Sequence, residues 1–318
     1  RGMPKTSWNY EGIFPAMQCP FHDDFSIDEE ELRRFTSWLS THKGIGGLVP
    51  NGHTGEVFAL TAAQRAEVTR IVVDQVKGKL PVISGLCCEG ITEAKEHALM
   101  ARDSGASGLL VMPPHYWLRF GMRPSHVIDY FTAIGETSEL DLVAHVYPAW
   151  CKAAYSEEVL AQLCRLPWVK GIKLGTRDLN KYARDIKAIR NSNASVKILT
   201  CHDEYLLPTM VQGVDGALVG FASFIPEMIT ELYRMVCDGE LKAAMEMQMR
   251  INPLKDAVYG IGEPTGDAHA RMKAALVLSG RMKSAVVQPP IQKSPGSELD
   301  LVREALNDAG LLLHQAAE

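Results

Sequence analysis

Lys173 lies within residues 171–174, an otherwise apolar run of the kind that forms buried strands. A second lysine, Lys170, stands an odd number of positions away, so the two side chains point to opposite faces of a strand. Apolar surroundings disfavour the charged form of a lysine, which lowers its pKa and leaves a neutral amine that can attack a carbonyl. The run therefore predicts a Schiff-base lysine at Lys173, against the alternative of a solvated lysine at a strand end.

Two further features offer chemistry at the ends of apolar runs. Tyr147 ends one run, and the loop Gly52-His53-Thr54-Gly55 follows another. A phenol held near an amine can act as an acid or a base. A tight loop with a hydroxyl and several backbone N–H groups, placed before a helix, can hold a carboxylate. Taken singly, each feature also fits an ordinary strand-end aromatic or a simple turn.

The pattern of metal-ligating residue types does not predict a metal site. His202, Asp203 and Glu204 are adjacent in sequence, which is poor spacing for ligands of one ion. The seven cysteines include no CxxC pair. Because their number is odd and the chain is long, we expect reduced cysteines and a cytoplasmic protein rather than a disulfide framework.

These candidate catalytic and binding residues can form one site only if the ends of their strands lie close together. Short apolar runs alternate along the chain with longer amphipathic stretches, and continuously apolar strands favour a parallel sheet covered on both faces. Eight such units favour a (β/α)8 TIM barrel over a doubly wound open sheet, which alternation alone leaves possible. In such barrels the active site lies at the C-terminal ends of the strands. The expected strands are residues 13–17, 47–50, 81–84, 108–112, 142–147, 169–174, 196–200 and 216–220.

Helix signals separate these runs. Thr61 and Gln64 have the form of a capping box, and Gly105 and Gly135 have the form of helix ends. Helix starts are also expected near Ser26, Thr92, Pro124, Ser156 and Pro226.

The strand signal fades after about residue 238. The segments 239–259, 267–278 and 297–313 all have helical patterns. We therefore expect a barrel over residues 1–238 and a C-terminal helical extension, residues 239–318, packed on it.

Length and composition agree with one enzyme-sized unit. The chain has 318 residues, and a barrel takes about 250 of them. The net charge of −5 argues against nucleic acid or an anionic membrane as the main partner, although a local positive pocket can still bind a small anion. No apolar run approaches the roughly 20 residues of a membrane span.

Taken together, the sequence resembles the dihydrodipicolinate synthase and N-acetylneuraminate lyase family. The resemblance runs from about Ile13 to Leu311, and the order and spacing of its pieces make it specific. The matching pieces are Gly52-His53-Thr54-Gly55-Glu56, Pro114-His115-Tyr116, Val146-Tyr147-Pro148, Gly171-Ile172-Lys173, His202-Asp203-Glu204 and Gln288-Pro289-Pro290.

The resemblance implies a (β/α)8 barrel with a C-terminal helical segment, assembled as a homotetramer. It implies that Lys173 forms the Schiff base and that Tyr147 moves protons at the substrate. Thr54, with the N–H groups of the loop between Gly52 and Gly55, would bind the carboxylate of a 2-oxo acid. The resemblance also implies that Tyr116 reaches into a neighbouring subunit's site and that Val219 lines the pocket.

Two departures from the family pattern, and one match to its lyase branch, bear on the reaction. His53 replaces the usual Thr or Ser of the relay to the tyrosine. If its imidazole points inward, it should contact Tyr147 or the substrate and give activity an ionisation near neutrality; the alternative is an outward, packed ring. Lys152 stands about where dihydrodipicolinate synthases carry an arginine, which makes that activity doubtful. Asp203 and Glu204 fit either substrate hydroxyls, as in the lyase branch, or a solvated helix start.

The function expected is a Schiff-base-forming lyase or aldolase that acts on pyruvate or a pyruvate-yielding 2-oxo acid. The protonated imine is itself the electron sink, so we expect no metal and no organic cofactor. The alternatives are a sugar-acid dehydratase of 2-keto-3-deoxy acid type, dihydrodipicolinate synthase itself, and a non-catalytic ligand-binding barrel.

Overall fold

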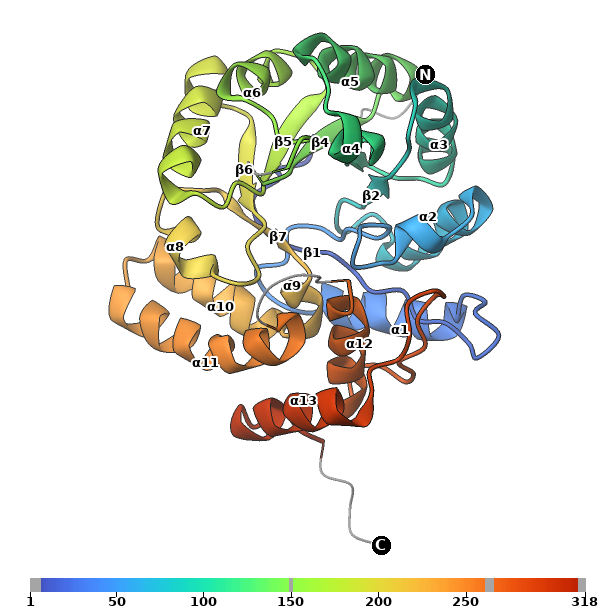
Figure 1. The fold of residues 1–318 in the computed structure, drawn as a ribbon, viewed down its shortest axis with the longest axis vertical. Helices are drawn as coiled ribbons and strands as arrows, with labels where there is room; N and C mark the ends of the chain where they lie inside the picture. Colours follow the sequence, from blue (N-terminus) through green and yellow to red (C-terminus); the bar gives the residue numbers. More distant parts are fainter. Residues whose placement is uncertain (1–6, 149–150, 261–265, 314–318) are drawn as a thin grey trace, which may run out of the picture.

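A computed structural model describes residues 7–148, 151–260 and 266–313 of the chain. Parallel strands form one curled sheet in the order β1-β7-β6-β5-β4-β3-β2, and helices surround it (Figure 1). The strands are β1 (Gly12–Pro15), β2 (Ile83–Leu86), β3 (Gly108–Val111), β4 (Asp141–Val146), β5 (Val169–Leu174), β6 (Lys197–Thr200) and β7 (Gly216–Val219).

The segment between β1 and β2 closes this sheet into a barrel. Val49 bridges Ala16 beside β1, and Leu48 bridges Val82 beside β2, both in parallel. The bridging segment takes the second strand position expected from sequence, but it is too irregular to form a continuous strand. The fold is therefore the predicted (β/α)8 barrel.

The helices that follow the strands form the outer layer (Figure 1). Thr61 and Gln64 form the predicted capping box, and Ser156 caps its helix as expected. Besides the short 3₁₀ turn Val57–Ala59, the helices of this layer are α1 (Glu29–Ser40), α2 (Ala62–Val76), α3 (Ile91–Asp103), α4 (Tyr116–Phe120), α5 (Pro124–Ser138), α6 (Glu157–Cys164), α7 (Leu179–Ser192), α8 (Leu206–Met210), α9 (Phe221–Phe224) and α10 (Pro226–Cys237).

The prediction that a helix ends at Gly135 is wrong, because α5 continues to Ser138. A side-chain carbon at Gly135 would lie 2.3 Å from the ring of Trp168, so this glycine allows close packing inside the helix. Gly105 does follow a helix end, with a φ of 95° that favours glycine.

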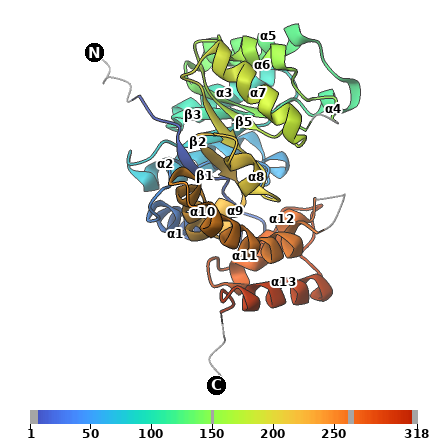
Figure 2. The same ribbon diagram turned by 90° about the vertical axis from the view of Figure 1, so that its left-hand side faces the viewer.

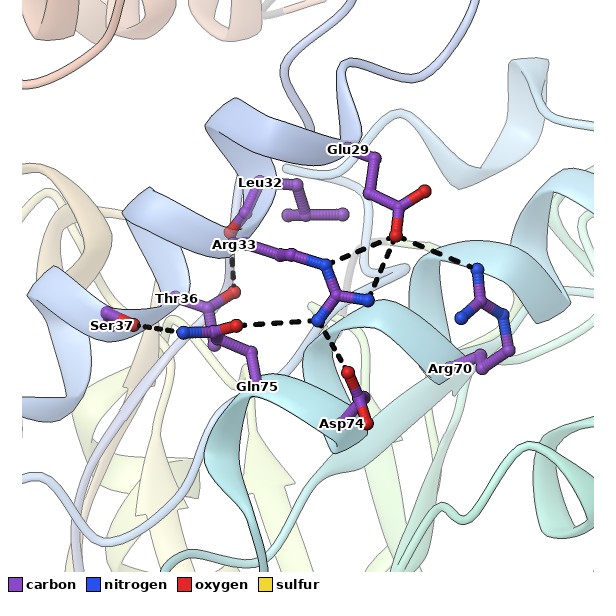
Figure 3. A network of polar contacts seen from close by, with 8 residues as sticks. All are labelled: Glu29, Leu32, Arg33, Thr36, Ser37, Arg70, Asp74 and Gln75. Atoms are coloured by element: carbon purple, nitrogen blue, oxygen red, sulfur yellow. Dashed lines mark hydrogen bonds and ion pairs between the residues drawn. The ribbon is translucent and has the colours of Figure 1, made fainter.

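Helices α1 and α2 lie side by side and carry a polar network on their outer surfaces (Figure 3). Arg33 pairs with Asp74 at 2.6 Å and with Glu29 at 2.9 Å, and Gln75 donates to Ser37 at 2.6 Å. Exposed pairs of this kind contribute about 0–1 kcal/mol each. The buried apolar side chains between the two helices therefore contribute more to their packing than this network.

Three further helices form the C-terminal extension, and α13 lies at the opposite end of the molecule from α5 and α6 (Figure 2). They share one continuous apolar cluster with α1, α2 and α10, so the extension packs on the barrel. The boundary at residue 238 stays a prediction. Across the described ranges, no helix has both the length and the apolar character needed to cross a membrane. The helices of the extension are α11 (Leu241–Tyr259), α12 (Ala268–Leu278) and α13 (Gly296–Asp308).

Candidate active site

Lys173 and Tyr147 project from neighbouring strands on the same side of the sheet. Lys173 of β5 pairs directly with His145 of β4, so their side chains share a face. Tyr147 follows β4 two residues after His145, and the two rings meet edge to face with centroids 4.9 Å apart. This face is the barrel interior at the C-terminal ends of the strands, where barrel enzymes carry their active sites.

The environment of Lys173 favours a neutral amine. Its side chain is partly buried, whereas Lys170 on the opposite face of β5 is exposed. Burial lowers the pKa of Lys173, an effect that the neighbouring Cys201 and Asp203 oppose. A lowered pKa increases the fraction of neutral amine available to attack a carbonyl.

His53 points inward and contacts the tyrosine. Its Nε2 lies 3.2 Å from the Tyr147 hydroxyl, so that hydroxyl can donate to the ring. Burial and the charge of Lys173 lower the pKa of His53 to about 3. This shift favours a neutral ring near pH 7, and the ionisation of activity expected from His53 stays a prediction.

Sequence reasoning missed two residues beside His53. The Nε2 of His115, which precedes α4, lies 3.4 Å from the Nε2 of His53. The Sγ of Cys87, directly after β2, lies 3.9 Å from the same atom of His115. Burial raises the pKa of the Cys87 thiol to about 11. Their position in the sequence could have indicated a role in the site, because each of them follows the end of a barrel strand.

The loop from Gly52 to Glu56 is tightly folded on the barrel. A side-chain carbon at Gly55 would lie 2.9 Å from the Met17 carbonyl oxygen, so only glycine fits there. The N–H groups of Gly55 and Glu56 donate within the loop, to the carbonyls of Gly52 and His53. In the described part of the chain, no backbone carbonyl accepts from the N–H groups of His53 and Thr54, which suits them to a bound anion.

Gly220 keeps a polar space open beside this loop. A side-chain carbon built on Gly220 would lie 3.0 Å from the Thr54 hydroxyl and 3.3 Å from an Asp203 carboxylate oxygen. Thr54 and Asp203 therefore face a common space at the strand ends. Asp203 also accepts from the Phe221 N–H at 3.3 Å and from the hydroxyl of Tyr259 at the end of α11.

Asp203 and Glu204 do not form a solvated helix start. Asp203 is buried, and Glu204 pairs with Arg177 at 2.8 Å. Burial raises the pKa of Asp203 to about 6, although the bond from Tyr259 opposes the shift.

The prediction that Val219 lines the pocket is wrong. Its side chain belongs to the apolar cluster shared with the outer helices. Its neighbour Leu218 belongs to the cluster inside the barrel, with Leu199 and Val143. The predicted position is one residue too late, and a shift of one residue along a strand reverses the face.

Comparison with known proteins places this chain in a family. Residues 9–309 match the dihydrodipicolinate synthetase family. The chain belongs to that family. It is 32% identical to the 4-hydroxy-tetrahydrodipicolinate synthase of Methanopyrus kandleri, over 95% of this chain and 97% of that protein. It is 26% identical to the probable 2-dehydro-3-deoxy-D-pentonate aldolase YjhH of Escherichia coli K12, over 95% and 98%.

Solved structures of the dihydrodipicolinate synthetase family share the fold. YagE from Escherichia coli K12, solved in complex with pyruvate, aligns with a TM-score of 0.86 and 24% identity, over 95% of this chain and 99% of that one. A monomeric dihydrodipicolinate synthase variant also aligns with a TM-score of 0.86, at 23% identity, over 95% and 98%. Family membership makes this chain a lyase of the Schiff-base-forming class.

Two residues that the resemblance singled out lie at the rim of the site. Tyr116 begins α4; its N–H donates to Glu89 at 2.8 Å, and its side chain is 45% exposed. Lys152 is exposed and donates to the Arg119 carbonyl at 3.3 Å. In this chain His115, and not Tyr116, is the residue in contact with His53.

A buried ion pair anchors the loop from Gly52 to Glu56, called the carboxylate loop after its predicted role, to the C-terminal extension. Lys273 of α12 contacts Glu56 at 2.8 Å, and both side chains are 1% exposed. Lys273 also donates to the Val286 carbonyl at 2.6 Å, and Glu56 accepts from the Gln288 N–H at 2.7 Å. The extension therefore fixes the loop on which Thr54 stands.

Lys273→Met should lower the free energy of unfolding by about 3–5 kcal/mol, because it leaves Glu56 buried without its partner. Lys255→Met is the matched control, since Lys255 lies on α11 and pairs with an exposed Asp256. Its expected cost is about 0–1 kcal/mol. Equal urea midpoints for the two variants would contradict the anchoring role.

Asp203→Asn should change how stability depends on pH. The pKa of Asp203 rises from 3.8 to about 6 on folding, so between these values the folded state binds more protons than the unfolded state. The free energy of unfolding therefore falls as pH rises through this window, by on the order of 3 kcal/mol from this group. Asn lacks this titration. Urea unfolding of the wild type and of Asp203→Asn at pH 4 and pH 7 checks this expectation. If the two proteins differ in free energy of unfolding by the same amount at both pH values, the pKa shift is contradicted.

Proposed function

We propose that this chain is a class I aldolase that cleaves a 2-oxo acid to pyruvate and an aldehyde through an imine on Lys173. The observation that supports it best is the shared inward face of Lys173, His145 and Tyr147 at the C-terminal ends of β4 and β5. Such a face holds an amine and a phenol over the same space. A non-catalytic ligand-binding barrel is less well supported, because both Lys173 and Tyr147 are present inside the barrel.

Imine formation uses the neutral amine of Lys173. The amine attacks the C2 ketone of the substrate, and the resulting carbinolamine loses water as protons move from nitrogen to oxygen. Tyr147 carries these protons, because its hydroxyl contacts the neutral His53 ring at 3.2 Å. Burial raises the pKa of Tyr147, so the group starts as a phenol that can give a proton.

Cleavage follows from the protonated imine. Tyr147, left as a phenolate once it has protonated the departing water, removes the proton of the C4 hydroxyl. The C3–C4 bond then breaks, and its electron pair moves into the imine to give an enamine and an aldehyde. Tyr147 then returns a proton to C3, and water hydrolyses the imine to release pyruvate and the Lys173 amine. No oxidant or reductant enters these steps.

The carboxylate of the substrate would rest on the loop from Gly52 to Gly55. The Thr54 hydroxyl and the N–H groups of His53 and Thr54 supply neutral donors there. Gly55 lets the loop pack closely against the Met17 carbonyl, whereas a side-chain carbon at Gly52 would meet no other atom within 4 Å. Asp203, Glu204 and Lys152 would meet polar groups farther along the substrate.

Two other reactions share the same imine. A sugar-acid dehydratase would lose water from C3 and C4 without breaking the carbon chain, and a dihydrodipicolinate synthase would add pyruvate to an aldehyde. Incubation with 2-keto-3-deoxy acids, followed by product analysis, separates them. Pyruvate plus an aldehyde supports the proposal, and a single dehydrated oxo acid contradicts it.

We further infer a homotetramer in the cytoplasm, in which Tyr116 enters a neighbouring subunit's site. The exposed aromatic side chains of α4 support this, since Phe120 is 72% exposed beside Tyr116. All seven cysteines lie among the described residues, and each is a free thiol there. Light scattering should give four chain masses, and one chain mass would contradict the assembly.

A further inference from the structure

Three metal-ligating side chains meet beside Tyr147. They are His53 from the carboxylate loop, Cys87 after β2, and His115 before α4. Their ligand atoms all lie within 4.8 Å of one another. Each comes from the end of a different barrel strand, so the barrel scaffold itself holds them together.

The distances between these atoms suit a tetrahedral ion. Bonds of about 2.0–2.1 Å to nitrogen and about 2.3 Å to sulfur, at tetrahedral angles, separate two nitrogens by about 3.4 Å and a nitrogen from a sulfur by about 3.6 Å. The two Nε2 atoms lie 3.4 Å apart, and Cys87 Sγ lies 3.9 Å from His115 Nε2. The third pair, Cys87 Sγ and a ring nitrogen of His53, also lies within 4.8 Å.

A carboxylate also lies beside the cluster. On the outer side of His115, a Glu89 carboxylate oxygen lies 4.0 Å from Nδ1 and accepts from the His115 N–H at 3.0 Å. The bond to Glu89 fixes the backbone of His115 beside the cluster, while 4.0 Å is too long for a hydrogen bond between this carboxylate and the ring.

We propose that His53, Cys87 and His115 bind one divalent transition-metal ion of the Zn²⁺ class, and that the bound ion blocks proton transfer through Tyr147. Two imidazoles and a thiolate select Zn²⁺ or Co²⁺ over Mg²⁺ or Ca²⁺, which require oxygen ligands. The thiol proton of Cys87 leaves to solvent as the metal–sulfur bond forms. The ion then takes the lone pair of His53 Nε2, to which Tyr147 otherwise donates at 3.2 Å.

A second cluster lies next to this one and provides the control. Cys88, Glu93 and His97 also bring their ligand atoms within 4.8 Å of one another. Cys88 belongs to the apolar cluster on the helix side, whereas Cys87 packs with Val57 and Met112. Substitution of Cys87 therefore tests for a metal in the cluster with His53 and His115, and substitution of Cys88 tests for a metal in the cluster with Glu93 and His97.

Titration of the purified full-length chain with Co²⁺ tests the site. We expect one equivalent to bind, with the visible bands of tetrahedral cobalt and a thiolate charge-transfer band in the near ultraviolet. Both should disappear in Cys87→Ala and His115→Ala and persist in Cys88→Ala. Loss of a direct ligand should weaken binding by more than the about 10–100-fold caused by loss of an outer partner. A spectrum without the thiolate band, or one lost in Cys88→Ala instead, would overturn the site.

Zn²⁺ inhibition tests whether the bound ion blocks proton transfer through Tyr147. This part of the proposal rests on the proposed function. Each protein is compared with its own metal-free turnover rate. Zn²⁺ should suppress turnover of the wild type and of Cys88→Ala at the concentration that displaces Co²⁺, and should leave the Cys87→Ala rate unchanged. Full turnover with the site filled would overturn the inhibitory role. The cobalt spectrum decides binding even if no 2-oxo acid proves to be a substrate.

Discussion

Lys173→Ala should reduce turnover to the background rate while the fold persists. The reaction depends on a covalent bond to the Lys173 amine, and alanine has no nucleophile to replace it. The side chain is only partly buried on β5, and the buried Asp203 nearby keeps its hydrogen bonds from the Tyr259 hydroxyl and the Phe221 N–H when Lys173 is removed. The variant should therefore unfold close to the wild-type temperature.

Lys170→Ala is the matched control, because it removes a lysine from the same strand on the exposed face. Its turnover should equal that of the wild type, since Lys170 does not face the barrel interior. Its free energy of unfolding should change by about 0.5 kcal/mol or less, as for other surface substitutions. Measurable turnover in Lys173→Ala, or a comparable loss in Lys170→Ala, would contradict the assignment.

Tyr147→Phe should lower kcat by about 10²–10⁴, the usual contribution of a positioned acid–base group. Phenylalanine keeps the ring against His145 but removes the hydroxyl that donates to His53. Imine formation should survive at a reduced rate, because the amine of Lys173 is untouched. Steady-state kinetics and single-turnover imine formation, measured separately, check both expectations.

Tyr130→Phe controls for the loss of a buried hydroxyl as such. Tyr130 lies on α5, and its hydroxyl donates to the Cys88 carbonyl at 3.4 Å, in the helix layer. Its kcat should stay close to that of the wild type. Near wild-type kcat in Tyr147→Phe would show that the proton moves by another route.

The fold could be predicted from sequence because its signals are local. Continuously apolar runs indicated the strands, and Thr61 with Gln64 indicated a helix start. The error at Gly135 arose because a glycine inside a helix looks like a helix end, and only the tertiary contact with Trp168 explains it. The irregular segment around Leu48 could not be foreseen, since its bridges depend on the closure of the whole barrel.

The candidate site could be predicted only as far as the strand ends specify it. Lys173 and Tyr147 were found because their strands and the family resemblance agree. Val219 was misplaced by one residue, which is enough to reverse its face. The approach of His115 and Cys87 to His53 depends on distances across three strands, which a sequence does not contain.

The protonation of His53 also required the structure. From sequence alone, a histidine is expected to titrate at its ordinary pKa of about 6.5, which is close to neutral pH. Enclosure by the barrel and the nearby Lys173 lower that pKa to about 3, so the ring passes protons without storing charge at neutral pH. This is the property that a hydroxyl residue has at the same position in the family.

Borohydride reduction in the presence of pyruvate, followed by peptide mapping, tests the central claim most directly. Reduction converts the imine to a stable amine and fixes the substrate carbon on the residue that formed it. The account predicts a single reduced pyruvyl group on Lys173, loss of activity, and no adduct in Lys173→Ala. An adduct mapped to Lys170, or no adduct with pyruvate or any other 2-oxo acid, would contradict it.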